Sequence, residues 1–335
     1  MRIALLALPG SMKSSLAGIS DMFWLANQII SQSPSHSRNR EESDPCFSVS
    51  VITADGKSVS DAQGRPVESE GAFTGSTVFD MIISAGMRLD EEKFPLAKEA
   101  VKEAAAWIKN QYQQGTRIAG VCAGGFVLGE AGLLDGRTCT TTWWLFHTLK
   151  ERYPLANPVW GKSLVEHENI MTSGGPLSWV DVVLKVIGQE AGPDIARQTA
   201  DIAVADSQPL SQHIYAPQGF LNSVDPILMK AENLIRYVNP AITVEELAAK
   251  MNMTTRTLHR KIEGLLRESP KTFITRVRIE TALVLLEKSD KNLSQVAYES
   301  GYSDETAFRR AFNNIMGMSP GRYREWIRHR RTHLP

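Results

Sequence analysis

The sequence has few of the features that mark secreted, metal-stabilised or membrane proteins. Its three cysteines, Cys46, Cys122 and Cys139, give no disulfide framework and match no zinc-site spacing. No apolar run approaches the length of a membrane span, and Met1 leads into a strand-like pattern in place of a signal peptide. We therefore expect a globular protein of a reducing cytoplasm, without a membrane partner, a metal site or another cofactor.

The chain also lacks a net charge, because 37 Lys and Arg balance 37 Asp and Glu. The two parts of the chain nevertheless differ in net charge. Residues 226–335 contain 19 basic and 12 acidic residues, whereas residues 1–225 contain 18 and 25. Such an asymmetry is expected when one part of a protein binds phosphates and another does not.

A length of 335 residues is enough for two domains, each with its own core. We place the first domain at residues 1–207 and the second at residues 226–335. The stretch between them, residues 208–225, is polar and contains prolines, which is typical of a linker. In the first domain strand patterns alternate with helical ones, which predicts a parallel sheet covered by helices on both faces.

The most informative stretch of the second domain is residues 293–324. Val296 and Ala297 predict a short amphipathic helix, and Gly301 predicts a tight turn with positive φ. Ser303 is the expected cap of a second helix. The polar face of that helix consists of Glu305, Thr306, Arg309, Arg310 and Asn313. This is a helix-turn-helix pattern whose second helix can enter a major groove, with an ordinary helical hairpin as the alternative.

A second copy of the pattern lies about fifty residues upstream. Thr243 begins a short helix, Asn252 supplies the turn, and a second helix follows. The outward-facing polar residues of that helix are Thr255, Arg256, His259, Arg260 and Lys261. Between the two copies, Ser269 and Pro270 begin a longer amphipathic helix.

Several short motifs occur in a fixed order: Leu258-His259-Arg260, Ser269-Pro270, Arg278-Ile279, Gly301-Tyr302, Phe308 with Phe312, and Ser319-Pro320. In this order they resemble the DNA-binding domain of the AraC family of transcription regulators. The resemblance implies an all-α domain in which a central helix holds two recognition helices about one DNA turn apart. It makes the ten polar residues named above the expected contacts to double-stranded promoter DNA. Arg267 departs from the pattern, since a glycine is common there.

In the first domain a strand over residues 117–121 runs into Cys122, and Ala123 and Gly124 then lead into a helix. This is the form of a nucleophile elbow, where small neighbours permit a sharp strand-to-helix turn. The helix N-terminus is expected to lower the pKa of the thiol. A buried structural cysteine is the alternative.

The GVCAGG motif around Cys122, the AGLLDGR motif of residues 131–137 and Trp143 resemble the DJ-1/PfpI, or class I glutamine amidotransferase-like, domain. The resemblance implies a flavodoxin-like, doubly wound α/β sheet. Together with the AraC-type module it resembles the GlxA-like subgroup of regulators. In enzymes of this superfamily a histidine after the next strand assists the cysteine, but here Thr142 stands at that place. Threonine is no base at neutral pH, so we predict no catalytic residue and no enzyme.

The elbow can still bind a small molecule, because ligands of doubly wound sheets lie beyond the carboxyl ends of the strands. The predicted ligand-binding residues are Cys122, Ala123, Gly124, Thr142 and Trp143. The ring of Trp143 suits a cation. The resemblance to known regulators implies an effector of the amino-acid or amine class, a homodimer, and RNA polymerase as a further partner.

We therefore expect a cytoplasmic, sequence-specific transcription regulator, specifically an activator, whose acidic half senses a metabolite and whose basic half binds a promoter. Two alternatives depend on Cys122. One is a cysteine-dependent, amidohydrolase-like enzyme with a DNA-binding tail. The other is a thiol redox sensor, because an exposed thiolate oxidises reversibly.

Overall fold

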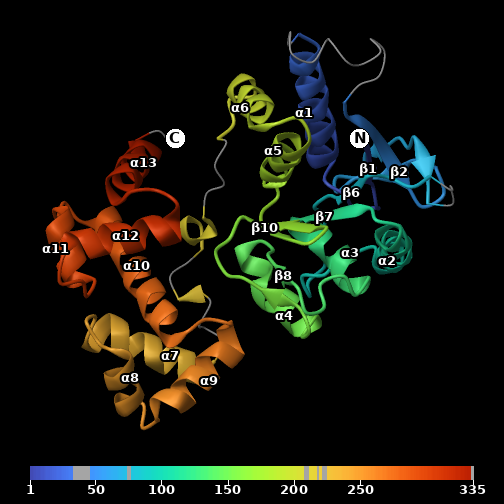
Figure 1. Cartoon of the computed structure of the whole chain (residues 1–335). Coiled ribbons are helices and arrows are strands. Elements are labelled where there is room, and N and C mark those ends of the chain that lie inside the picture. Colours follow the sequence, from blue (N-terminus) through green and yellow to red (C-terminus); the bar gives the residue numbers. More distant parts are fainter. Residues whose placement is uncertain (33–45, 74–76, 207–210, 217–218, 221–224, 333–335) are drawn as a thin grey trace. The chain divides into compact units, whose positions relative to one another are not determined.

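The structure is a computed structural model that describes residues 1–32, 46–73, 77–206, 211–216, 219–220 and 225–332. These residues form two compact units, Met1–Gln212 and His213–Pro335 (Figure 1). Much of the linker predicted over residues 208–225, namely 208–210, 217–218 and 221–224, lies outside the described residues. Of the remainder, Gln212 is buried and belongs to the first unit.

The first unit is built on a seven-stranded sheet with the order β10-β11-β7-β6-β1-β2-β5. Its strands are β1 (Arg2–Leu6), β2 (Ser48–Thr53), β5 (Gly71–Ala72), β6 (Met81–Ser84), β7 (Arg117–Val121), β10 (Leu164–His167) and β11 (Ile170–Ser173). Neighbouring strands are parallel except for β10, which pairs antiparallel with β11 at the edge. Two short pairs, β3 (Val59–Ser60) with β4 (Pro66–Val67) and β8 (Thr138–Cys139) with β9 (Asn157–Pro158), stand apart from this sheet.

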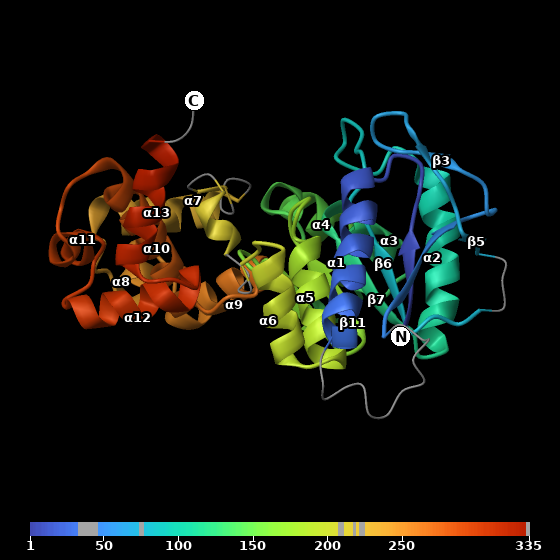
Figure 2. The same ribbon diagram turned by 90° about the horizontal axis from the view of Figure 1, so that it is seen from above.

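Helices cover both faces of the sheet, as Figure 2 shows. One face carries α1 (Lys13–Gln32), α5 (Trp179–Glu190) and α6 (Pro193–Ile202), and the other carries α2 (Lys98–Gln113) and α3 (Gly125–Glu130). A further helix, α4 (Phe146–Arg152), lies between β8 and β9 in the chain. The central strands are buried on both sides, which explains their continuous apolar runs. The predicted doubly wound α/β fold is confirmed, and the antiparallel edge strand β10 adds to it.

The second unit is helical. Its helices are α7 (Pro226–Asn233), a π-helical turn (Leu234–Val238), α8 (Val244–Lys250), α9 (Thr255–Leu266), α10 (Pro270–Lys288), α11 (Leu293–Glu299), α12 (Glu305–Met316) and α13 (Pro320–Thr332). The long helix α10 contacts α8, α9, α11, α12 and α13. It can do so because buried residues such as Phe273, Ile274 and Ile279 lie on several of its sides. In the described part of the chain no helix has both the length and the apolar character needed to cross a membrane.

The two helix-turn-helix motifs meet at the turn of the second one. Gly301 has a φ of +87°, and a Cβ atom there would lie 2.0 Å from the carbonyl oxygen of Pro240, which precedes α8. The guanidinium group of Arg278 on α10 donates to Pro240 O at 2.6 Å and to Ile242 O at 3.0 Å. The loop before the first motif is therefore fixed against the turn of the second.

One predicted helix cap is wrong, and two other turn residues behave as the sequence suggests. The cap of α12 is Asp304 and not Ser303, because the Asp304 carboxylate accepts the Ala307 N–H at 2.8 Å. A negative charge is favoured at a helix N-terminus. Asn252 and Arg267 both take the left-handed conformation, so α9 ends at Arg267 without the glycine that is common there.

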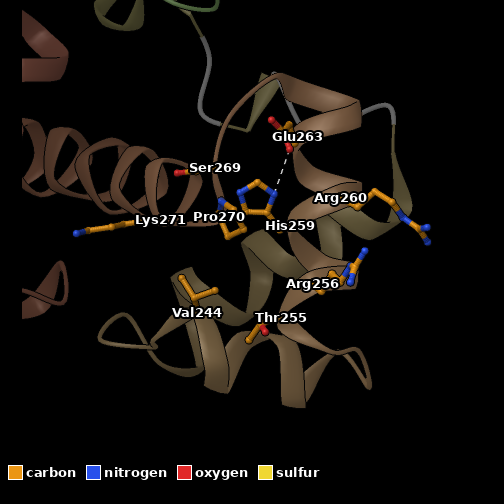
Figure 3. Close-up of a pocket in the computed structure, with 9 residues that line it drawn as sticks. All are labelled: Val244, Thr255, Arg256, His259, Arg260, Glu263, Ser269, Pro270 and Lys271. Carbon is orange, nitrogen blue, oxygen red and sulfur yellow. Dashed lines mark ion pairs between the residues drawn. The ribbon is translucent and has the colours of Figure 1, made fainter.

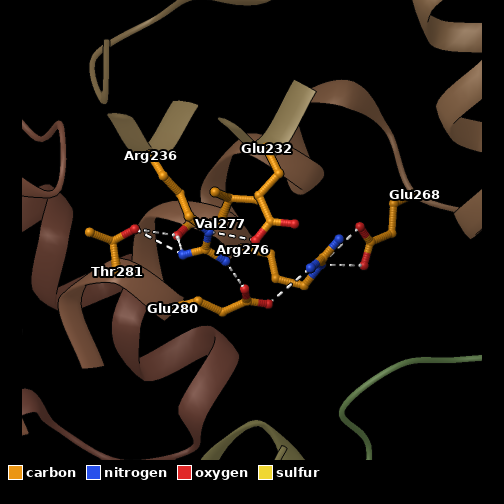
Figure 4. Close-up of polar contacts among 7 residues, drawn as sticks. All are labelled: Glu232, Arg236, Glu268, Arg276, Val277, Glu280 and Thr281. Carbon is orange, nitrogen blue, oxygen red and sulfur yellow. Dashed lines mark hydrogen bonds and ion pairs between the residues drawn. The ribbon is translucent and has the colours of Figure 1, made fainter. Parts of the chain in front are cut away.

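Two buried arginines connect the start of the second unit to α10 (Figure 4). Arg276 lies between Glu268, 3.2 Å away, and Glu280, 2.9 Å away. Arg236 contacts the same Glu280 and also Glu232. Glu280 therefore bridges two guanidinium groups, and each buried charge in this cluster has an opposite partner, as burial requires.

We expect Glu280→Gln to lower the free energy of unfolding of the second unit by about 3 kcal/mol, because it leaves two buried cations undercompensated. Burial raises the pKa of Glu280, but the positive charges of Arg276 and Arg236 lower it by a larger amount. The pKa of Glu280 is therefore below its ordinary value of 4.5. The stabilisation is therefore complete above that value and is lost as the pH falls through the lowered pKa. Urea unfolding of the full chain at neutral pH and at about pH 3 measures both effects.

Glu325→Gln on α13 is the control, because Glu325 is exposed. Equal losses for Glu280→Gln and Glu325→Gln at neutral pH would contradict the assignment of a bridging role to Glu280.

Candidate functional site

The helices α9 and α12, which are expected to read DNA, begin with side-chain caps that fix where their polar faces start. The Thr254 hydroxyl accepts the Thr257 N–H at 3.1 Å at the start of α9, and Asp304 does the same for α12. The inner faces are buried through Leu258, Ile262, Phe308 and Phe312. The opposite faces are therefore directed toward solvent.

The ten predicted DNA contacts occupy these outer faces. Eight are exposed, namely Thr255, Arg256, His259, Arg260, Thr306, Arg309, Arg310 and Asn313. Lys261 and Glu305 are half-buried. The structure therefore brings each group of five together on its own helix, while the individual roles in DNA binding stay predictions.

The cationic side chains of these helices differ in whether they are paired with a carboxylate of the protein. Within the described ranges, Arg256, Arg260, Lys261 and Arg310 form no ion pair or side-chain hydrogen bond, so they can reach an external anion. Arg309, by contrast, is held by Glu305, whose carboxylate lies 2.7 Å from its Nε.

Glu305 itself is fixed from two sides. The Ser294 hydroxyl on α11 donates to it, and this bond together with Arg309 lowers the pKa of Glu305. On α9, His259 similarly pairs with Glu263 at 3.1 Å when the imidazole is protonated. The i, i+4 spacing of both pairs is visible in the sequence and distinguishes Glu305, Arg309 and His259 from the other predicted contacts.

A groove runs beside α9 (Figure 3). It is lined by Val244, Thr255, Arg256, His259, Arg260, Glu263, Ser269, Pro270 and Lys271. Arg256 and Arg260 point out on one side of the helix, while His259 turns toward Glu263. The groove also borders the first turns of α8 and α10. Arg256, Arg260 and Lys271 bring positive charge to this groove, and Glu263 brings a negative charge.

Three residues of the groove, Val244, Ser269 and Lys271, are not among the predicted DNA contacts. Ser269 caps α10, accepting the Thr272 N–H at 3.1 Å, and Val244 is the first residue of α8. The capping signals of both helices were visible in the sequence, but their nearness to α9 depends on tertiary packing.

In the first unit, Cys122 stands at the tip of the predicted elbow. It follows β7 directly and has a φ of +53°, a conformation that is strained for a residue with a side chain. The adjacent glycines make the turn possible by close packing. A Cβ atom on Gly124 would lie 2.1 Å from Ser84 O, and one on Gly120 would lie 2.8 Å from the Cα of Gly125.

The elbow thiol is buried, with 3% of the residue exposed. Burial raises the pKa of Cys122 to about 11, and the N–H groups of Ala123 and Gly175, which favour the thiolate, do not offset this. The prediction of a lowered pKa is therefore wrong. Desolvation raises the pKa of the thiol by more than the N-terminus of α3 lowers it, since α3 has only six residues.

A base for the thiol is not apparent in the described part of the chain. Thr142, which replaces the expected histidine, is buried and precedes the turn Trp143–Leu145. His167 lies on β10, where its Nδ1 accepts the Thr138 N–H at 3.3 Å. No group of His, Cys, Asp and Glu among the described residues is arranged to hold a metal ion.

The side chain of Gln212, a residue of the predicted linker, lies beside the elbow. Gln212 is 6% exposed. Its Oε1 accepts the Trp143 N–H at 2.7 Å, and its Nε2 donates to Thr141 O at 2.8 Å and to Lys162 O at 2.7 Å. No sequence signal pointed to Gln212, because a lone glutamine among polar residues has no periodicity.

Comparison with known proteins agrees with the division of the chain into two units. A model of the DJ-1/PfpI family matches residues 44–189, and a model described as a helix-turn-helix domain matches residues 247–325. The chain joins a DJ-1/PfpI domain to an AraC-type helix-turn-helix domain.

Two relatives are similar to this chain along most of their length. The HTH-type transcriptional regulator CdhR of Pseudomonas aeruginosa is 27% identical over 82% of this chain and 80% of its own. The HTH-type transcriptional regulator GlxA of Rhizobium meliloti is 30% identical over 63% of this chain and 65% of its own.

A crystal structure from Vibrio parahaemolyticus, of a protein described as a transcriptional regulator, supports the fold. It has a TM-score of 0.51 and 17% sequence identity, and the match covers 60% of this chain and 98% of that one. At this identity the likeness concerns the fold alone.

The burial of Cys122 and the raised pKa of its thiol disfavour nucleophilic attack by this residue. A buried, neutral thiol forms little thiolate, which both amide hydrolysis and oxidation to a sulfenic acid require. Neither of the two alternatives that depend on Cys122 is favoured by this geometry.

We expect Cys122 to react with iodoacetamide roughly 100-fold more slowly in the folded chain at neutral pH than after unfolding. A pKa of about 11 in place of 9.0 reduces the thiolate fraction by about that factor. Mass analysis of the Cys122 peptide after timed labelling measures the rate, with the half-buried Cys46 as a reference in the same sample. Equal rates for Cys122 in the folded and unfolded chain would contradict the prediction.

Proposed function

We propose that the chain is a DNA-binding regulator of transcription whose DJ-1/PfpI domain senses a small molecule. The observation that carries the proposal is the pair of capped helices α9 and α12, whose polar faces are largely exposed while α10 contacts both helices. Two such helices on one rigid core can enter successive major-groove segments of the same DNA face. The names of the two relatives reported above, both HTH-type transcriptional regulators, support the same proposal.

The free cations suggest how the work of recognition is divided. Arg256 and Arg260 on α9 and Arg310 on α12 can bind guanine edges or phosphates, because no carboxylate within the described ranges holds them. Arg309 is already oriented by Glu305, which fixes the direction in which its remaining N–H groups point. Preorganised donors lose less side-chain entropy on binding.

For the sensory domain we propose an effector of the amino-acid or amine class, bound at the elbow without reaction. Backbone carbonyl groups at Thr141 and Lys162 accept hydrogen bonds, and the ring of Trp143 is partly exposed. Such a set suits a nitrogen donor or a cation.

We further propose that the protein acts in the cytoplasm as a homodimeric activator that contacts RNA polymerase. The dimer is supported by exposed apolar side chains on two neighbouring helices. Trp24 on α1 and Ile202 on α6 are 61% and 60% exposed, and α1 contacts α6. Exposed apolar groups of this size are typical of interaction surfaces.

We expect Arg256→Ala, Arg260→Ala and Arg310→Ala to weaken binding to a duplex selected from a random library with the full chain. A lost bidentate base contact should cost about 1 to 3 kcal/mol and relax the preference at one base pair. A lost phosphate contact should weaken all duplexes and lower the salt slope by about 1. Titrations of the selected and of an unrelated duplex at several salt concentrations separate the two effects.

Arg88→Ala is the matched control, because Arg88 is an exposed arginine of the first unit. Losses no larger than that of Arg88→Ala in all three variants would refute DNA recognition by these faces.

We expect one or more amino acids or amines to raise the thermal stability of the full chain. A ligand at a hundred times its dissociation constant adds about 2.7 kcal/mol. The increase should disappear in Trp143→Ala and persist in Trp24→Ala, the variant of a tryptophan exposed on α1. A ligand whose effect is the same in both variants binds elsewhere than at the elbow.

A further inference from the structure

We propose that Gln212 is an internal ligand of a site beside the elbow, which a carboxamide-like or ammonium-like effector takes over by displacing it. The site, called the elbow pocket, consists of the backbone groups of Thr141, Trp143 and Lys162 that bind the Gln212 side chain. Displacement would free the segment that leads to the helix-turn-helix domain. The inference rests on the proposed sensory function and specifies the ligand chemistry and the regulation of that site.

The first support is that the pocket is complementary to a carboxamide. Gln212 offers two N–H donors and an acceptor, and the pocket answers with two carbonyl groups and one N–H, all at 2.7 to 2.8 Å. All three partners are backbone groups of Thr141, Trp143 and Lys162. Their positions are therefore set by the fold and not by mobile side chains.

The second support is a space kept free for this group. A Cβ atom on Gly174 would lie 2.1 Å from the Nε2 of Gln212 and 2.7 Å from Thr141 O. Any other residue at position 174 would expel the carboxamide. The N–H of Gly174 is fixed by Ser163 O at 2.8 Å, so the glycine cannot simply move away.

The third support is the closeness of Gln212 to the elbow. Thr141, which accepts one hydrogen bond from Gln212, donates its own hydroxyl to Cys122 O at 3.4 Å. The backbone N–H of Gly175, next to Gly174, is near enough to the Cys122 thiol to favour its thiolate. The carboxamide thus occupies part of the region where ligands of doubly wound sheets bind.

The backbone of the same segment is also attached to the first unit. The Gln212 N–H donates to Gly161 O at 2.8 Å, and the Ser211 hydroxyl donates to the same oxygen at 3.1 Å. Gln212 is the last residue of the first unit, and α7 begins at Pro226. Release of Gln212 would move the start of the connection upstream, adding up to about 3.3 to 3.6 Å of reach for each residue freed.

The pocket also defines which competitors are suitable. A primary amide reproduces all three contacts, and an ammonium group can donate to both carbonyl oxygens. A carboxylate would place negative charge against the carbonyl oxygens of Thr141 and Lys162, so it should not bind there.

The test uses the full chain with Gln212→Gly and propionamide, which is the side-chain fragment of glutamine. Propionamide should raise the thermal stability of Gln212→Gly more than that of the unsubstituted chain, whereas propionate and N-methylpropionamide should not. Equal shifts in both proteins, or no shift in the variant, would overturn the assignment of an internal ligand.

Displacement is tested by hydrogen exchange of the segment that contains Gln212. In Gln212→Ala the backbone N–H at position 212 should exchange about tenfold faster or more than in the unsubstituted chain, the factor that corresponds to one net hydrogen bond. Gln63→Ala, which alters an exposed glutamine of the same unit, should not change it. In the unsubstituted chain, propionamide but not propionate should accelerate the same exchange, and failure to do so would overturn displacement.

DNA binding is measured on the same proteins to keep the two hypotheses apart. One outcome is that propionamide stabilises Gln212→Gly as expected while none of the proteins binds DNA. That result would refute the proposed function and leave the assignment of Gln212 as an internal ligand intact. Normal DNA binding, with neither stabilisation of Gln212→Gly by propionamide nor faster hydrogen exchange at position 212, would refute only the assignment of Gln212 as an internal ligand.

Discussion

The second unit depends on the burial of α10 on almost all sides. A helix in that position must be apolar along several faces, and it must satisfy any charge that it carries. Both conditions are met, because residues such as Phe273 and Ile279 are buried and Arg276 is enclosed by Glu268 and Glu280. A buried ion pair gives little net stability but penalises any arrangement in which it is broken. The network therefore fixes the register of α7 against α10 more than it adds to the free energy of folding.

Most of the fold could be predicted from the sequence because it follows from local patterns. The helix-turn-helix pairs are encoded by apolar periodicity, by caps such as Ser269 and by turn residues such as Gly301 and Asn252. The error at the start of α12 is a shift of one residue, from Ser303 to Asp304. Two polar residues stand side by side there, and only the backbone decides which of them accepts the hydrogen bond.

The candidate sites were less predictable, because they depend on burial and on contacts between distant parts of the chain. The elbow motif around Cys122 was readable, but the direction of its pKa shift was not, since desolvation is a property of the packed domain. Gln212 meets its partners Thr141 and Lys162 at separations of 71 and 50 residues. The pair of Glu305 and Arg309 is the opposite case, since its spacing on one helix was visible and was not used.

The joint at Gly301 has a consequence for the DNA. Pro240, Gly301 and Arg278 connect the loop before one motif to the turn of the other. The distance between the two motifs is therefore fixed. B-DNA turns by about 35° per base pair, as its repeat of about 10 to 10.5 base pairs requires. If both motifs contact DNA as proposed, a single base pair inserted between the two contacted segments would rotate one of them away from its helix, and the contacts of Arg278 with Pro240 and Ile242 oppose a compensating movement of the motifs. Operators for such a protein should thus tolerate changes of sequence more readily than changes of length.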